Sequence, residues 1–234
     1  MQFWQQPVEK LLKLFLNSPC PLCQRPTKQE ICENCIKQLY KCQLSHPNNL
    51  WHGSLPLFAW GKYGGILKRA IATMKYDNHP EIGYALGRYL GESWLLHSPL
   101  ANKQLLVVPI PMYPEKEKQR GFNQATLIAQ GFCEITGLKL KRNGLKRVRS
   151  TEAQFGLSFV QREKNLSEAF AIGEDFRQRP QFPVILVDDI YTTGATAKSA
   201  VQTFRQTGIA ISGMVTVAAA AKAEERQNSA TSPI

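Results

Sequence analysis

The chain has 234 residues, which is room for one ordinary domain with a small appendage, or for one large α/β domain. Hydrophobic residues make up 43% of it, so we expect a packed core, and wholesale disorder is excluded. The 29 Lys and Arg residues against 18 Asp and Glu give a formal charge of +11, which favours an anionic partner such as a phosphate, a nucleotide or a nucleic acid.

Neither membrane insertion nor secretion is indicated by the sequence. No apolar stretch approaches the ~18 residues that a membrane-spanning helix needs. The first seven residues lack the basic start and the apolar run of a secretory signal. Five of the six cysteines lie between positions 20 and 42, which is typical of a metal site in a reducing compartment rather than of a secreted disulfide framework. We therefore expect a cytoplasmic protein without a membrane span.

Three segments are expected along the chain. Residues 1–50 combine an amphipathic helix over 2–16 with the cysteine-rich stretch, and the polar residues 45–49 indicate a linker. Residues 51–220 would form a larger domain, and the polar tail 221–234 is expected to be flexible. The helix over 2–16 would dock on its own protein, or alternatively on a membrane surface or a partner.

Strands alternate with helices in the larger domain. Gly83, Gly87 and Gly91 form a small-residue face on one of these helices, where another element can approach closely. Cys133 falls in the middle of another helix and would be a core thiol. The alternation argues for an α/β fold with a mostly parallel sheet and right-handed crossovers. The predicted strands cover 55–60, 105–110, 184–187 and 209–217, and the predicted helices cover 64–74, 80–97, 122–135 and 194–207.

Two CxxC pairs, separated by eight residues, stand near the start of the chain: Cys20 with Cys23, and Cys32 with Cys35. A CxxC turn lets two thiolates face one ion, and two such turns complete the tetrahedral sulfur site that zinc prefers. Because all four ligands would be protein thiolates, we expect this zinc to be structural. The alternatives are a redox pair, buried structural thiols, or replacement of one ligand by a nearby residue: Cys42, His46 or His52.

The stretch from Val184 to Thr196 has the most informative pattern in the chain. Four apolar residues bring a strand to its carboxyl end, Asp188 and Asp189 follow, and a Thr/Gly loop then opens a helix. Ligands of open α/β sheets gather at the carboxyl ends of strands, and backbone N–H groups at a helix start bind phosphate. Gly194 keeps the loop free of a side chain where the anion would approach. The alternative is a plain strand, turn and capped helix with incidental acids.

The P-loop and dinucleotide-binding patterns are both missing from the sequence. The stretch 184–196 instead resembles the phosphoribosyl pyrophosphate (PRPP) signature of type I phosphoribosyltransferases. From about residue 18 to 220, the chain resembles the competence protein F (ComF) family, whose members join an N-terminal zinc-binding segment to a phosphoribosyltransferase domain. Further matching pieces are Lys75-Tyr76, Val108–Pro111, Arg120–Gln124, and a pattern that runs from Arg149 through Gln154, Gly156, Leu157 and Arg162 to Asn165.

The resemblance implies a role for each matching position. The acids Asp188 and Asp189 would meet the ribose hydroxyls of PRPP, directly or through Mg²⁺. The loop after the strand over 105–110 would face the pyrophosphate, and Arg120, at the start of the next helix, would add charge to it. The segment 147–165 would be a flexible loop that closes over the site. The remaining implied contacts are Thr192, Thr193, Gly194, Ala195 and Thr196 for the 5′-phosphate, Pro109 and Ile110 for the pyrophosphate side, Arg149 and Arg162 from the flexible loop, and Lys75 on the local match alone.

In this enzyme class, pyrophosphate leaves the sugar while a nitrogen base attacks the anomeric carbon through an oxocarbenium-like transition state. Catalysis then depends on positioning and on neutralising the leaving group with Mg²⁺ and basic side chains. The resemblance thus implies a Mg²⁺-dependent phosphoribosyltransferase. It also implies an association with DNA uptake in natural transformation, and so with competence-machinery proteins. No residue set identifies the acceptor base.

A run of basic residues between positions 139 and 149 could serve nucleic acid. It contains no acid and no aromatic residue that would stack on bases. It could track the backbone of single-stranded DNA, or form a solvated surface that raises the local potential for a polyphosphate. The alternative functions are a non-catalytic nucleic-acid-binding competence factor with this fold, and an adaptor whose partners dock on residues 1–45. The basic residues are Lys139, Lys141, Arg142, Lys146, Arg147 and Arg149.

Overall fold

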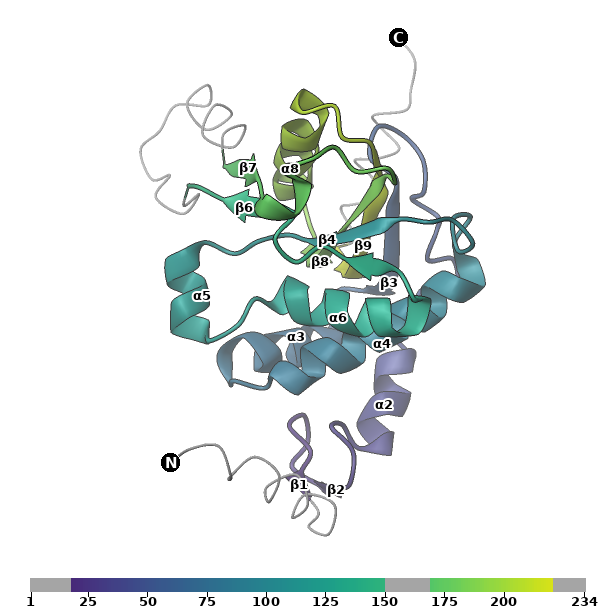
Figure 1. The fold of residues 1–234 in the computed structure, drawn as a ribbon. Helices are drawn as coiled ribbons and strands as arrows, with labels where there is room; N and C mark the ends of the chain where they lie inside the picture. Colours follow the sequence, from purple (N-terminus) through teal and green to yellow (C-terminus); the bar gives the residue numbers. More distant parts are fainter. Residues whose placement is uncertain (1–17, 150–168, 221–234) are drawn as a thin grey trace.

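The computed structural model of the chain describes residues 18–149 and 169–220 (Figure 1). The helix predicted over 2–16, the tail 221–234 and Arg162 lie outside the described residues. The elements in chain order are β1 (Ser18–Pro19), β2 (Pro26–Thr27), α2 (Glu33–Tyr40), β3 (Leu57–Lys62), α3 (Gly65–Tyr76), α4 (Pro80–His97), β4 (Leu106–Pro109), α5 (Pro114–Arg120), α6 (Gln124–Thr136), β5 (Lys139–Leu140), β6 (Leu145–Arg147), β7 (Phe170–Ile172), the 3₁₀ turn η1 (Glu174–Phe176), β8 (Val184–Tyr191), α8 (Ala195–Gln206) and β9 (Ile211–Ala219).

Five strands form the central sheet in the order β3-β9-β8-β4-β5, and every neighbouring pair is parallel. This confirms the predicted α/β fold. In β8, Ile185 and Val187 pack into the hydrophobic core on one side of the sheet, whereas Val184 and Leu186 pack into the core on the other. Strands that are buried on both faces need continuous apolar runs, as β8 has. Because all five strands are parallel, their carboxyl ends meet along one edge of the sheet.

Helices cover both faces of this sheet (Figure 1). On one face lie α3, α4 and α6, whose fully buried side chains include Trp94 and Phe132. The other face carries α8 together with the antiparallel pair β6–β7, and there Phe176 and Phe204 meet edge to face at 5.8 Å. Each large apolar side chain buried in this way contributes about 1.5–3 kcal/mol. These two layers hold the sheet, and with it the carboxyl edge, in place.

The predicted small-residue face of α4 packs directly on α6. A Cβ atom at Gly87 would overlap the carbonyl oxygen of Ile128, and one at Gly131 of α6 would overlap the carbonyl oxygen of Tyr84. At Gly83 the nearest atoms would be the Met74 sulfur, at 2.8 Å, and a side-chain carbon on α6. The glycines therefore let two helix backbones approach more closely than any residue with a side chain would allow.

The cysteine-rich segment packs against the rest of the chain through α2. Tyr40 at the end of α2 lies edge to face on Trp60 at 6.0 Å and tilted on Tyr89 at 5.3 Å, and its hydroxyl donates to Glu92 at 3.1 Å. Burial raises the pKa of Tyr40 to about 12, with Glu92 adding to the effect. The predicted linker over 45–49 runs beside β3, since the Ala59 N–H donates to the Pro47 carbonyl at 3.0 Å.

Two expectations for the carboxyl edge are wrong in detail. Strand β8 does not end at Val187: it continues to Tyr191, so both acids lie within the strand. Arg120 does not begin the helix after β4, because it is the last residue of the short helix α5. Pro114 occupies the first turn of α5, and Gly121 ends it with a φ of 86°, a left-handed conformation that suits glycine.

Candidate functional site

The loop between β8 and α8 forms the first half of the candidate site. Gly194 caps α8 with a φ of 75°, and a Cβ there would overlap the hydroxyl of Tyr191, so both the conformation and the space require glycine. The loop surrounds a hollow of about 40 Å³. Its N–H groups and hydroxyls, next to the start of a helix, suit a single phosphate group. The lining residues include Asp188, Tyr191, Thr192, Thr193, Gly194, Ala195 and Thr196, so six of the predicted residues are brought together here.

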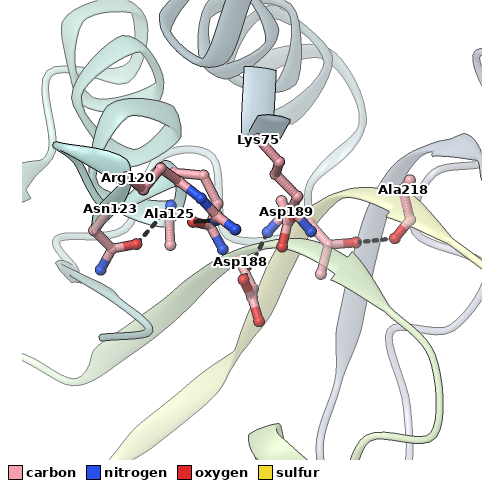
Figure 2. Close-up of polar contacts among 9 residues, drawn as sticks. Lys75, Arg120, Asn123, Ala125, Asp188, Asp189 and Ala218 are labelled. Atoms are coloured by element: carbon pink, nitrogen blue, oxygen red, sulfur yellow. Dashed lines mark hydrogen bonds and ion pairs between the residues drawn. The ribbon is translucent and has the colours of Figure 1, made fainter. Parts of the chain in front are cut away.

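The two acids of β8 point to opposite sides of the strand (Figure 2). Asp188 lines the hollow of the β8–α8 loop, and its Oδ1 accepts the Asp189 N–H at 2.8 Å. Desolvation and the neighbouring Asp189 carboxylate raise the pKa of Asp188 well above the ordinary carboxyl value. A half-buried carboxyl with a raised pKa beside a phosphate-sized hollow is suited to hydrogen bonding with a sugar or to sharing a divalent cation.

Asp189 forms an ion pair with Lys75, which reaches it from the end of α3 (Figure 2). The side chain of Asp189 is 6% exposed and that of Lys75 is 18% exposed, so the pair is largely withdrawn from water. A buried carboxylate needs such a partner, because an unpaired one would lose most of its hydration. Lys75 therefore lies beside the acids, whereas the sequence suggested it only as a PRPP contact, through a local match.

The Arg120–Gln124 motif links the loop after β4 to α6. The Asn123 amide donates to the Ile110 carbonyl at 3.0 Å, and its oxygen accepts the Ala125 N–H at 2.9 Å. Asn123 therefore caps α6 and fixes the loop that follows β4. Arg120 donates to Gln124 at 2.7 Å, and its guanidinium lies 5.8 Å from the ring centroid of Tyr76.

Sequence reasoning assigned no role to Asn123 or Tyr76. An Asn directly before an apolar helical repeat was the available signal for a helix cap. Nothing in the local sequence connects Tyr76 with Arg120, because that contact depends on how α3 and α5 meet in the fold.

The basic run is divided between two places. Lys139 begins the edge strand β5, whereas Lys146 and Arg147 lie in β6. Arg142, Lys146 and Arg147 line one side of a cleft of about 480 Å³, whose other side comes from α5 and α6. Lys139 and Lys141 do not line it. Arg149 is exposed at the end of the described part of the chain before residue 150.

The four cysteines of the two CxxC pairs come together as predicted. Their sulfur atoms all lie within 4.8 Å of one another, and those of Cys23 and Cys32 are 3.5 Å apart. Tetrahedral zinc with Zn–S bonds of about 2.3 Å requires sulfur atoms roughly 3.8 Å apart, so the cluster fits a zinc ion. Cys42, His46 and His52 are not part of the cluster.

Hydrogen bonds lower the pKa of one thiol in this cluster, which favours the thiolate form that binds a metal cation. Burial acts to raise the pKa of Cys20, but the N–H groups of Cys32, Leu22 and Cys23 outweigh it and lower the pKa to about 7. Burial raises the pKa of Cys35 well above the ordinary thiol value. In α6, burial likewise raises the pKa of Cys133 to about 12, in keeping with the predicted core thiol.

Comparison with known proteins identifies the group of relatives. No protein-family model matches the chain. Competence protein F of Haemophilus influenzae is 28% identical over 208 residues, which cover 85% of this chain and 89% of that protein. Competence protein ComFC of Bacillus subtilis is 26% identical over 205 residues, which cover 86% of this chain and 77% of that protein. The chain is therefore similar to proteins of the ComF family over most of its length.

Another similar protein is the DNA utilization protein YhgH of Salmonella typhimurium. It is 28% identical over 213 residues, which cover 82% of this chain and 86% of that protein. Among solved structures, an adenine phosphoribosyltransferase from Leishmania donovani is 15% identical with a TM-score of 0.41, covering 84% of this chain and 73% of that one. Within the described residues, no helix is both long enough and apolar enough to cross a membrane.

Proposed function

We propose that this chain binds PRPP at the β8–α8 loop and transfers the phosphoribosyl group to a nitrogen base. The observation that carries the proposal is the phosphate-sized hollow at the start of α8, with Asp188 at its edge. A hydroxyl-rich loop at a helix start suits the 5′-phosphate. The Asp188 carboxylate, which lines the same hollow, suits the ribose hydroxyls. The chemistry of the loop therefore matches a phosphorylated sugar.

The transfer breaks the bond between the anomeric carbon and the pyrophosphate oxygen and forms a bond from that carbon to the base nitrogen. Such a step needs no protein nucleophile, so basic groups that accept the negative charge of the leaving pyrophosphate are the main requirement. Lys75 and Arg120 extend from α3 and α5 near the carboxyl edge, and Arg149 and Arg162 are further candidates. Mg²⁺ bound with the substrate would neutralise part of that charge, and Asp188 is the residue suited to hold it.

The remaining parts of the proposal concern the rest of the chain. Residues 1–50 would form a zinc-binding module with a structural ion, residues 51–220 the phosphoribosyltransferase-like domain, and residues 221–234 a tail. The name of the DNA utilization relative suggests that this chain also takes part in the use of DNA. The domain would then serve DNA uptake together with competence-machinery proteins.

A second candidate function is nucleic-acid binding without turnover. It is favoured by the cleft in which Arg142, Lys146 and Arg147 stand together. Neutralising these three residues should weaken binding of single-stranded DNA and flatten its salt dependence, whereas Asp188→Asn should leave both unchanged. An unchanged salt dependence in the triple variant would exclude this function for the cleft.

The transferase proposal is tested by measuring pyrophosphate release from PRPP with a panel of purine and pyrimidine bases. We expect release with at least one base, and a loss of about 100-fold or more in kcat/KM for Asp188→Asn. Asp77→Asn is the matched control. Asp77 is exposed and lies outside the hollow, so its substitution removes one carboxylate charge without changing the hollow. Equal rates in Asp188→Asn and the unchanged protein, or no release with any base, would contradict the proposal.

A further inference from the structure

A second cleft, separate from the phosphate hollow, lies where the end of α3 meets α5. Its volume is about 650 Å³. Four of its lining residues are cationic and none is acidic, although α5 carries Glu115 and Glu117 elsewhere on its surface. The cleft and the hollow share no lining residue. The cleft is lined by Lys75, Tyr76, Asn78, Lys116, Lys118, Gln119, Arg120 and Gly121.

An aromatic ring stands exposed in the middle of these charges. Tyr76 is 77% exposed, although Met74 is buried and Lys75 is half-buried just before it in α3. The Arg120 guanidinium lies 5.8 Å from the centroid of its ring. An exposed ring next to a guanidinium offers a flat surface for another aromatic group. Packing within the protein gives no reason for a ring of this size to face water.

We propose that this cleft binds a nucleotide, with its base on Tyr76 and its phosphates on the surrounding cations. A volume of about 650 Å³ is within the usual range for small-molecule sites. Four cations in a cleft whose lining holds no acid suit phosphate, and the amides of Asn78 and Gln119 add donors and acceptors for the polar edge of a base. The same chemistry is presented by a free nucleoside triphosphate and by a nucleotide within a single strand.

Lys75 connects this cleft to the carboxyl edge of the sheet. It lines the cleft and also holds Asp189 in the ion pair described above. The nucleotide would therefore be bound beside the proposed PRPP hollow, and it would share Lys75 and Arg120 with the proposed contacts of the pyrophosphate. The inference does not depend on turnover of PRPP.

The test is a titration of ATP, inorganic triphosphate and a short 5′-phosphorylated single-stranded oligonucleotide into the full chain. Tyr76→Leu should weaken binding of the base-containing probe by about 10-fold, because one stacked base is lost, and leave triphosphate binding unchanged. Lys118→Gln should weaken all binding probes by about 3-fold or more. Lys68→Gln, an exposed lysine on α3 outside the cleft, is the matched control for charge and should change nothing.

Each outcome either distinguishes a free nucleotide from a nucleotide within a single strand or overturns the proposal. Tyr76-dependent binding of ATP assigns the cleft to free nucleotides, and Tyr76-dependent binding of the oligonucleotide alone assigns it to single strands. Equal affinities for ATP and triphosphate, with no effect of Tyr76→Leu, would overturn base recognition. Loss of ATP binding in Asp188→Asn but not in Tyr76→Leu would place the nucleotide in the PRPP hollow instead, and no binding of any probe at millimolar concentration would overturn the proposal.

Discussion

The buried carboxylate of Asp189 forms an ion pair with Lys75, its one cationic partner within the described residues. Removing the partner of a buried charge is costly, because the remaining charge keeps its desolvation without its attraction. Lys75→Met should therefore lower the free energy of unfolding by about 3 kcal/mol. Denaturant unfolding of Lys75→Met and of the double variant Lys75→Met/Asp189→Asn measures this. The double variant should regain part of the loss, and equal losses in both would contradict the account.

Asp188 should make the stability of the protein depend on pH. Its pKa is raised in the folded state, so between about 4 and that raised value the folded chain holds a proton that the unfolded chain releases. Stability from this group is therefore lost as the pH rises through that window. Asp188→Asn escapes the loss and should melt at a higher temperature than the unchanged protein at neutral pH, with the difference shrinking toward pH 4. Thermal melts across this pH range measure the effect, with Asp77→Asn as control. The same pH dependence of the melting temperature in both variants would contradict the raised pKa of Asp188.

The position of the two acids could be predicted from the sequence, but their opposite directions were missed. The apolar run ends at Val187, so the strand was expected to stop there. The strand continues to Tyr191, because the backbone of β8 stays paired with β9 as far as Ala219. The alternation of side chains along a strand then separates Asp188 from Asp189. Lys75 could not be connected with Asp189 from sequence, since the pair joins α3 to β8 across more than a hundred residues.

At the scale of the elements, the contact between α4 and α6 should be very sensitive to added volume. Gly87→Ala would push a methyl group into the backbone at Ile128, which cannot move without displacing α6. We expect a loss of about 3 kcal/mol in the free energy of unfolding, at the upper end for overpacking. Gly83→Ala on the same helix is the matched control, because its methyl group would mainly meet the flexible end of Met74, and it should lose less. A larger loss for Gly83→Ala would contradict this packing.

Long apolar elements could be predicted from the sequence, and short polar ones could not. The helix over 80–97 was predicted with the bounds that α4 has, because its apolar face repeats over five turns. Helix α5 has seven residues and none of them is buried, so no hydrophobic period reveals it. Pro114 and Gly121 were its only signals. Strands β6 and β7 are three residues each, and their pairing depends on contacts between segments on either side of residues 150–168.

For the whole molecule, the cysteine cluster should contribute to global stability. Three of these cysteines belong to the same hydrophobic core as α3, α4 and α6: Cys20, Cys32 and Cys35. Loss of the ion should therefore lower the stability of the larger domain as well as that of the cysteine-rich segment. We expect one zinc per chain by elemental analysis, and a lower melting temperature in a single transition after chelation. Cys133→Ser, which changes a cysteine outside the cluster, should retain the zinc and the response to the chelator. Identical melts with and without chelator would contradict a structural ion.

The central claim is that the β8–α8 loop binds PRPP, and calorimetric titration of PRPP with Mg²⁺ into the zinc-loaded protein tests it most directly. Asp188→Asn serves as the comparison, since it keeps the shape of the side chain and removes the charge at the hollow. The account predicts saturable binding at one site per chain that is strongly weakened in the variant. The absence of heat and of any thermal shift at millimolar PRPP, or equal binding in Asp188→Asn, would contradict it.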